Sequence, residues 1–150
     1  MRANGWDVAL LDWAATRIGL PFAWGQTDCT LLVAEAIDVI TGATACASRF
    51  RDQWSDMASA VAWSRANRLD LLDGCVKTGC VTVVANPLSL QRGDLLLVPF
   101  MRFDDVQVWC GHVVVGNRAV SSSPEKGVHY LPTRLICEQN PGAVLLRVGA

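Results

Sequence analysis

The chain has 150 residues, enough for one folded domain that buries roughly two thirds of its unfolded surface. Lys and Arg total 13 against 14 Asp and Glu, giving a net charge of −1 without any basic run. This charge pattern excludes binding to nucleic acid or anionic membranes through a strong positive field. No segment reaches the roughly 18 apolar residues of a spanning helix. We therefore expect one domain over residues 1–150, no nucleic-acid partner and no membrane insertion.

Residues 1–7 lack the apolar centre of a signal peptide and lead directly into an amphipathic segment, so we expect synthesis and folding in the cytoplasm. The hydrophobic fraction is 51%, with six Trp. Two explanations stay open: a large apolar core, or an apolar surface that meets a partner protein.

The first half of the chain has helical periodicity. The pattern predicts a helix over residues 6–18 that Gly19 and Pro21 end, and a second helix capped by Thr27 or Asp28 and ended by Gly42. A third helix is expected over about residues 52–67, with a short helical turn at 69–73.

After Gly74 the pattern changes to short segments with high β-propensity, separated by turn residues. Strands are expected at residues 80–84, 94–99, 106–109, 112–115, 119–121, 127–130 and 144–148. Helices followed by antiparallel strands predict the α+β class.

The segment Pro21-Phe22-Ala23-Trp24-Gly25-Gln26-Thr27-Asp28-Cys29-Thr30 places one cysteine at the first turn of the second helix. Free N–H groups and the positive end of the helix dipole stabilise a thiolate there, so we expect a depressed pKa for Cys29. Its backbone N–H could also donate to an oxyanion.

His112, in the strand segment Gly111-His112-Val113-Val114-Val115, is the candidate base for this thiol. A cysteine nucleophile needs such a histidine, a group that orients it and donors for the oxyanion. Each residue alone is more often structural, as a small packing cysteine or a hydrogen-bonded strand histidine. Their joint appearance indicates a cysteine hydrolase.

These segments, together with Arg92-Gly93-Asp94-Leu95-Leu96, resemble the NlpC-type cell-wall peptidases over roughly residues 6–130. The similarity is greatest to a compact subgroup encoded in tail gene clusters of tailed phages and gene-transfer agents. The resemblance implies a papain-like fold, with N-terminal helices packed on a small antiparallel sheet. It also implies cleavage of amide bonds in peptidoglycan stem peptides without a cofactor. The implied location is the virion tail tip, with tail-tip or hub proteins as partners.

By the same resemblance, Cys29 matches the nucleophile, His112 the general base and Ser121 the third catalytic position. Asp28 matches the residue that caps the helix and fixes the loop. Asp94 matches a turn-and-strand marker, which we interpret as structural.

Three positions depart from the family pattern. Phe22 replaces a tyrosine that can donate toward the oxyanion, and Gln26 or the indole of Trp24 could substitute as donors. Thr30-Leu31 replaces Ser-Gly after the nucleophile. Ser121 carries no charge to stabilise an imidazolium, and His129 is a second, more remote candidate for the orienting role. These departures motivate an alternative: a structural tail-tip assembly protein of papain-like shape with a weak or lost active site.

Six cysteines leave further alternatives open. Cys75 and Cys80 could bridge a loop, while free buried thiols are the default for the others. A zinc site is a weaker hypothesis, because Cys75-x4-Cys80 and Cys110-x-His112 lack the usual paired spacings. We expect no metal.

Overall fold

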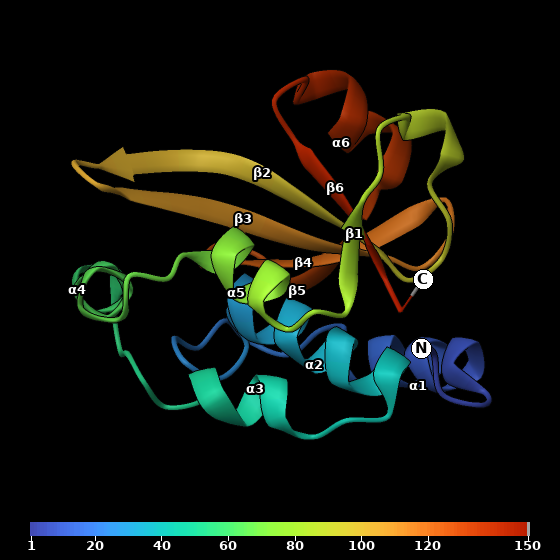
Figure 1. Ribbon diagram of the computed structural model, residues 1–150, viewed down its shortest axis with the longest axis horizontal. Helices are drawn as coiled ribbons and strands as arrows, with labels where there is room; N and C mark the ends of the chain where they lie inside the picture. Colours follow the sequence, from blue (N-terminus) through green and yellow to red (C-terminus); the bar gives the residue numbers. More distant parts are fainter. Residues whose placement is uncertain (150) are drawn as a thin grey trace.

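The computed structural model describes residues 1–149 and is a mixed α+β structure, with helices at the start of the chain and a sheet after them (Figure 1). The helices are α1 (Trp6–Arg17), α2 (Cys29–Thr41), α3 (Ala45–Phe50), α4 (Met57–Asn67), α5 (Leu71–Lys77) and α6 (Thr133–Gln139), with a 3-10 turn at Pro87–Ser89. The strands are β1 (Val81–Val83), β2 (Asp94–Phe103), β3 (Val106–Val114), β4 (Arg118–Ser123), β5 (Gly127–Pro132) and β6 (Val144–Val148). The predicted α+β class is confirmed, with helices packed on one antiparallel sheet.

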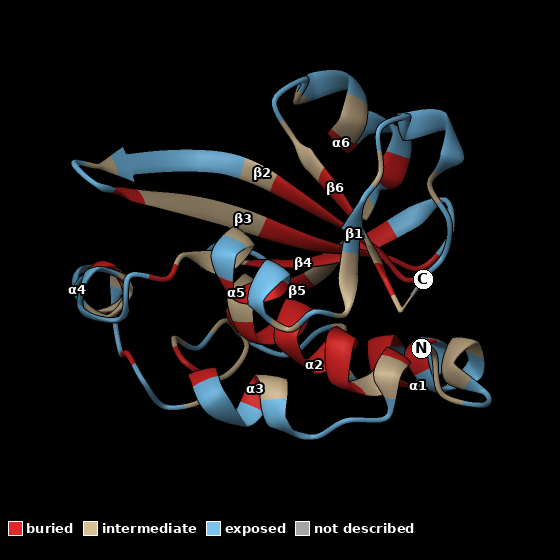
Figure 2. Cartoon of the chain, viewed as in Figure 1, coloured by how far each residue is buried: buried red, intermediate tan, exposed pale blue. Residues whose placement is uncertain are grey.

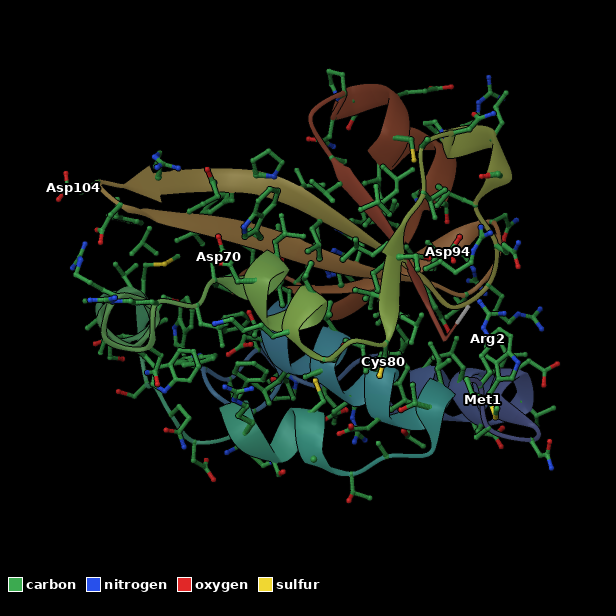
Figure 3. All side chains as sticks on the ribbon, in the orientation of Figure 1. Met1, Arg2, Asp70, Cys80, Asp94 and Asp104 are labelled. Carbon is green, nitrogen blue, oxygen red and sulfur yellow. The ribbon has the colours of Figure 1, made fainter. Side chains whose placement is uncertain are left out.

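The six strands form one sheet in the order β1-β6-β2-β3-β4-β5, and every neighbouring pair is antiparallel. The longest strands, β2 and β3, form a hairpin whose far end extends away from the rest of the sheet toward α4 (Figure 1). Asp104 lies at its tip (Figure 3) in the left-handed region, with φ of 51°. An ion pair of 3.0 Å between Arg65 and Asp105 joins α4 to this tip.

Helix α2 is the central element of the core, and nine of its 13 residues are buried (Figure 2). It packs against α1, α3 and one face of the sheet, where Leu32, Val33 and Ile40 meet Leu95 and Val113. Each large aliphatic side chain buried in this way stabilises the fold by about 1.5–3 kcal/mol. The opposite face of the sheet carries α6, so the sheet is covered on both sides (Figure 1).

Polar groups fix α2 in this core. The Glu35 carboxylate accepts hydrogen bonds from Trp13 Nε1 (2.7 Å), Arg17 Nε (2.7 Å) and Arg51 Nη2 (3.2 Å). Two opposing guanidinium groups and an indole compensate its burial, which would otherwise be costly. These bonds therefore fix the position of α2 against α1 and the segment after α3.

Asp94 has the structural role that the sequence predicts. It is fully buried at the start of β2 (Figure 3), accepts from the turn amide of Gln91 (2.9 Å) and pairs with Arg147 (2.9 Å). It holds the turn before β2 to β6.

The helix predicted over residues 52–67 begins only at Met57, because Asp56 and Ser59 form a capping box and Asp52 has φ of 61°. The two strands predicted at 106–109 and 112–115 are one strand, since Cys110 and Gly111 pair with Val98 and Leu97 of β2. Helices α3 and α6 are not predicted. No helix within residues 1–149 has the length and apolar character needed to cross a bilayer.

Candidate functional site

Asp28 organises the loop before α2. Its carboxylate is buried and accepts from Leu31 N–H (3.0 Å), Gly25 N–H (2.7 Å) and Trp54 Nε1 (2.8 Å). One bond caps the helix, and the other two fix the loop and a core tryptophan against it. Gly25 has φ of 73°, and a Cβ there would lie 2.7 Å from the carbonyl oxygen of Trp54. The predicted capping role of Asp28 is confirmed.

Cys29 is the first residue of α2 and is half-buried. Its thiol lies at the edge of β3, with Sγ 3.7 Å from the carbonyl oxygen of Trp109, to which the S–H donates. This edge is open because the β3–β4 ladder is limited to Val113↔Val120 and Val114↔Ala119. Beyond that ladder, side chains satisfy the carbonyls of β3.

Ser121 satisfies the next carbonyl along this edge. Its hydroxyl donates to the carbonyl oxygen of Gly111 (2.9 Å) and lies 3.8 Å from Cys110 Sγ. Within residues 1–149 no hydrogen bond joins Ser121 to a histidine ring. The structure therefore brings Ser121 to Cys110 rather than to His112.

Cys110 is the residue that contacts the Cys29 thiol. In its ionised form Cys110 accepts a hydrogen bond from the Cys29 thiol, which lowers the pKa of Cys110 to about 7, with a further contribution from the Ser121 hydroxyl and with burial opposing. The same bond and burial raise the pKa of Cys29, while a hydrogen bond with the Gly111 backbone acts the other way. The depressed pKa that we expected at Cys29 is thus found at its partner, because a thiolate that accepts a bond from a neighbouring thiol is stabilised.

His112 lies on the other face of the sheet. A Cβ at Gly111 would lie 2.7 Å from Val33 Cγ2, so position 111 faces α2, and strand alternation turns His112 away. The ring Nδ1 is 3.2 Å from the carbonyl oxygen of Leu96, which packs with α6. Burial lowers the pKa of His112, while hydrogen bonds with the backbone of Leu96 and Cys110 act the other way. The expected pair of Cys29 and His112 is not brought together in the structure.

The remaining predicted residues have separate positions. Trp24 lies near Cys29 and packs edge-on against Phe22, with ring centroids 4.9 Å apart. The amide of Gln26 donates to Asp52 instead of facing the thiols. His129 Nδ1 is 2.8 Å from the carbonyl oxygen of Gly127 on its own strand, so it does not orient His112.

A cleft of about 340 Å³ opens above Cys29 and Cys110. Its walls are mainly aromatic, from Phe22, Trp24, Phe50, Trp54, Trp63, Phe100 and Trp109. Its charged residues are all acidic: Asp28, Asp70 and Glu125. Asp70 lies at the start of α5, below the β2–β3 hairpin (Figure 3). His112 does not line this cleft, within the part of the chain that the structure describes.

Ser122 Oγ is a polar atom of the cleft that is buried without a hydrogen-bond partner among residues 1–149, whereas a hydrogen bond from the Trp109 indole acts to lower the pKa of Asp70, against the larger effect of burial. An unpaired buried hydroxyl is costly, so Ser122 favours a ligand that offers it a hydrogen-bond partner.

All six cysteines are free thiols, so Cys75 and Cys80 do not form the bridge that their spacing allows. Among residues 1–149 no cluster of three His, Cys, Asp or Glu side chains is placed to hold a metal ion.

The first prediction concerns the pH dependence of thiol alkylation. Only the thiolate reacts, so iodoacetamide modification of Cys110 should rise with pH and reach half its maximum at about pH 7. Burial raises the pKa of Cys46 to about 11, so that thiol should react far more slowly at neutral pH. Peptide mapping after brief alkylation across a pH series measures the extent of modification of both thiols.

The low pKa of Cys110 would be contradicted if Cys110 and Cys46 showed the same dependence of alkylation on pH. Cys29→Ala should move the Cys110 profile to higher pH, because it removes the side chain that donates to the Cys110 thiolate.

Comparisons with curated proteins and with solved structures gave no match. A comparison with family models gave a match over residues 1–138, to the family described as domain of unknown function DUF6950. Because this match covers most of the chain, including Cys29, Cys110 and the cleft, the protein belongs to the DUF6950 family.

Proposed function

We propose that the protein is an assembly component of a phage tail tip, papain-like in shape, that binds a peptide segment in its cleft without hydrolysing it. The tail-tip location rests on the resemblance of residues 6–130 to the compact tail-cluster subgroup of NlpC-type peptidases. The observation that carries the proposal is the position of His112, which lies on the face of the sheet away from α2. The neighbour of Cys29 is therefore Cys110 and not a histidine.

Within residues 1–149 no histidine lines the cleft, and this favours binding over hydrolysis. Burial and the neighbouring Cys110 raise the pKa of the Cys29 thiol, so it keeps its proton, and among residues 1–149 no histidine ring lines the cleft to take that proton or to protonate a leaving amine. The aromatic walls provide apolar area, and the Ser122 hydroxyl suits a carbonyl group of an extended peptide.

A second candidate, the peptidoglycan hydrolase, is favoured by the place of Cys29 at a helix start that lines a cleft. The Cys29 thiol would attack a stem-peptide amide, and the neighbouring Cys110 thiolate would take its proton.

One experiment separates the candidates. Wild type and Cys29→Ala are incubated with purified peptidoglycan, and the released peptides are measured by mass spectrometry. We expect equal background release from both. Release that depends on Cys29 would establish the hydrolase instead.

Tail assembly tests the binding role. Phe100 lines the cleft and is 61% exposed near the hairpin end, so Phe100→Ser should lower the number of completed tails without unfolding the protein. The matched variant Val83→Ser, at a β1 side chain that is 72% exposed and does not line the cleft, should assemble normally. Normal tails in the complete absence of the protein would contradict the assembly role.

A further inference from the structure

The floor of the cleft holds two thiols from elements that lie far apart in the sequence. Cys29 begins α2 and Cys110 lies within β3, yet both line the cleft, and Cys29 Sγ lies 3.7 Å from the carbonyl oxygen of Trp109, the residue that precedes Cys110. We propose that Cys29 and Cys110 form a redox-active pair that exchanges with small-molecule disulfides and closes to an intramolecular disulfide. This inference is independent of the proposed assembly role.

The backbone around the pair allows this close approach. Gly111 follows Cys110, and a Cβ at that position would lie 3.1 Å from the carbonyl oxygen of Cys29. Only glycine there lets the start of α2 meet β3. A disulfide needs a further approach of the sulfurs to about 2 Å by side-chain rotation. That rotation breaks only weak contacts, from Cys29 Sγ to Trp109 O (3.7 Å) and from Cys110 Sγ to Ser121 Oγ (3.8 Å).

The other four cysteines lack this arrangement. Cys75 is buried in the core, and burial raises its pKa to about 12. Cys80 Sγ is 3.4 Å from the carbonyl oxygen of Thr78, and Cys137 lies in α6 on the far side of the sheet. None of the four lines the cleft, within the described residues. A small disulfide that enters the cleft therefore meets Cys29 and Cys110 first.

The exchange balances without any other reactant. The Cys110 thiolate attacks one sulfur of the small disulfide, forms a mixed disulfide and expels one small thiolate. That thiolate takes the proton of Cys29, and the Cys29 sulfur then attacks Cys110 Sγ and expels the second small thiolate, which takes up the proton that Cys110 had lost to solvent. The protein loses two electrons and two protons, and one small disulfide becomes two small thiols.

Ionisation of Cys110 sets the pH range of the first step. The groups that face it from the neighbouring elements are the Cys29 thiol and the Ser121 hydroxyl, which favour the thiolate, while the carboxylates of Asp28, Asp70 and Glu125 line the same cleft. The Asp28 carboxylate is held by three donors, so it stays in place as the pair reacts. Exchange should be faster at about pH 8 than at about pH 6.

The test uses the reduced full chain and oxidised glutathione at about pH 8, followed by acid quenching, blocking of the remaining thiols and peptide mapping. We expect a Cys29–Cys110 cross-link as the main product, with the other four thiols blocked. Cys29→Ser should stop at a mixed disulfide between Cys110 and glutathione, and Cys110→Ser should slow the modification of Cys29 by at least about 10-fold. Cys137→Ser is the matched control and should still form the cross-link.

Two results would overturn the proposal that Cys29 and Cys110 form a redox-active pair. One is a cross-link that forms equally well in denatured protein or joins other cysteines. The other is loss of two thiols in Cys29→Ser. Circular dichroism of each variant shows whether it is folded, and Cys110→Ala, which also removes the second sulfur, replaces Cys110→Ser if that variant unfolds. Because the assay contains neither peptidoglycan nor tail proteins, its failure leaves the proposed assembly role to its own test.

Discussion

Replacing Asp28 with alanine should lower the free energy of unfolding by about 3–5 kcal/mol, the largest effect we expect from a single polar residue in this chain. The variant leaves Leu31 N–H, Gly25 N–H and Trp54 Nε1 without their common acceptor in a buried place. An unmade buried hydrogen bond costs about 1–3 kcal/mol, and part of this loss is recovered when the loop relaxes toward water. Urea unfolding followed by circular dichroism measures the change.

Asp56 provides the matched control. It caps α4 in the same way, since its carboxylate accepts from Ser59 N–H (2.7 Å), but it is exposed. Asp56→Ala should cost about 1 kcal/mol, the ordinary effect of losing a cap. Asp28→Asn keeps one oxygen acceptor and should fall between the two alanine variants. Equal losses for Asp28→Ala and Asp56→Ala would show that the loop and Trp54 gain nothing from the buried carboxylate.

The sequence predicts α2 well because its signals are local. Asp28 caps the helix through its own turn, Gly42 ends it in the left-handed region, and the apolar residues between them have helical spacing. The long-range partner Trp54 could not be predicted, since nothing local links residue 54 to residue 28. Helix α3 shows the same difficulty: its first N–H groups, at Cys46 and Ala47, bond to the carboxylate of Asp38 in the preceding helix.

The site was only partly predictable for a related reason. The position of Cys29 follows from local signals, but the identity of its neighbour depends on which face of β3 meets α2. Gly111 indicates which face of β3 meets α2, because a glycine inside a strand often marks the close approach of another backbone. Because position 111 faces the helix, alternation places both Cys110 and His112 on the other face, and the open edge beyond the short β3–β4 ladder lets the Cys110 side chain reach the cleft that Cys29 also lines.

Replacing Gly111 with alanine should lower the free energy of unfolding by about 2–3 kcal/mol and separate the two thiols. The added methyl group would lie 2.7 Å from Val33 Cγ2 and 3.1 Å from the backbone oxygen of Cys29. Val33 is fully buried on α2 and its β-branched side chain has one preferred rotamer in a helix, so the strain moves the helix away from β3. As the hydrogen bond between the thiols weakens, the pKa of Cys110 should rise from about 7.

Two measurements on Gly111→Ala distinguish a specific effect from general destabilisation. Urea unfolding gives the loss of stability, and alkylation of Cys110 across pH gives the shift of its midpoint to higher pH. Gly142→Ala is the control, because its added methyl group would lie 3.6 Å from Pro99 Cγ, an ordinary contact, and should leave both unchanged. A destabilised Gly111→Ala variant whose Cys110 midpoint stays near pH 7 would mean that the low pKa does not come from Cys29. The Ser121 hydroxyl would then be the group that stabilises the Cys110 thiolate, and Ser121→Ala, rather than Gly111→Ala, would raise the midpoint.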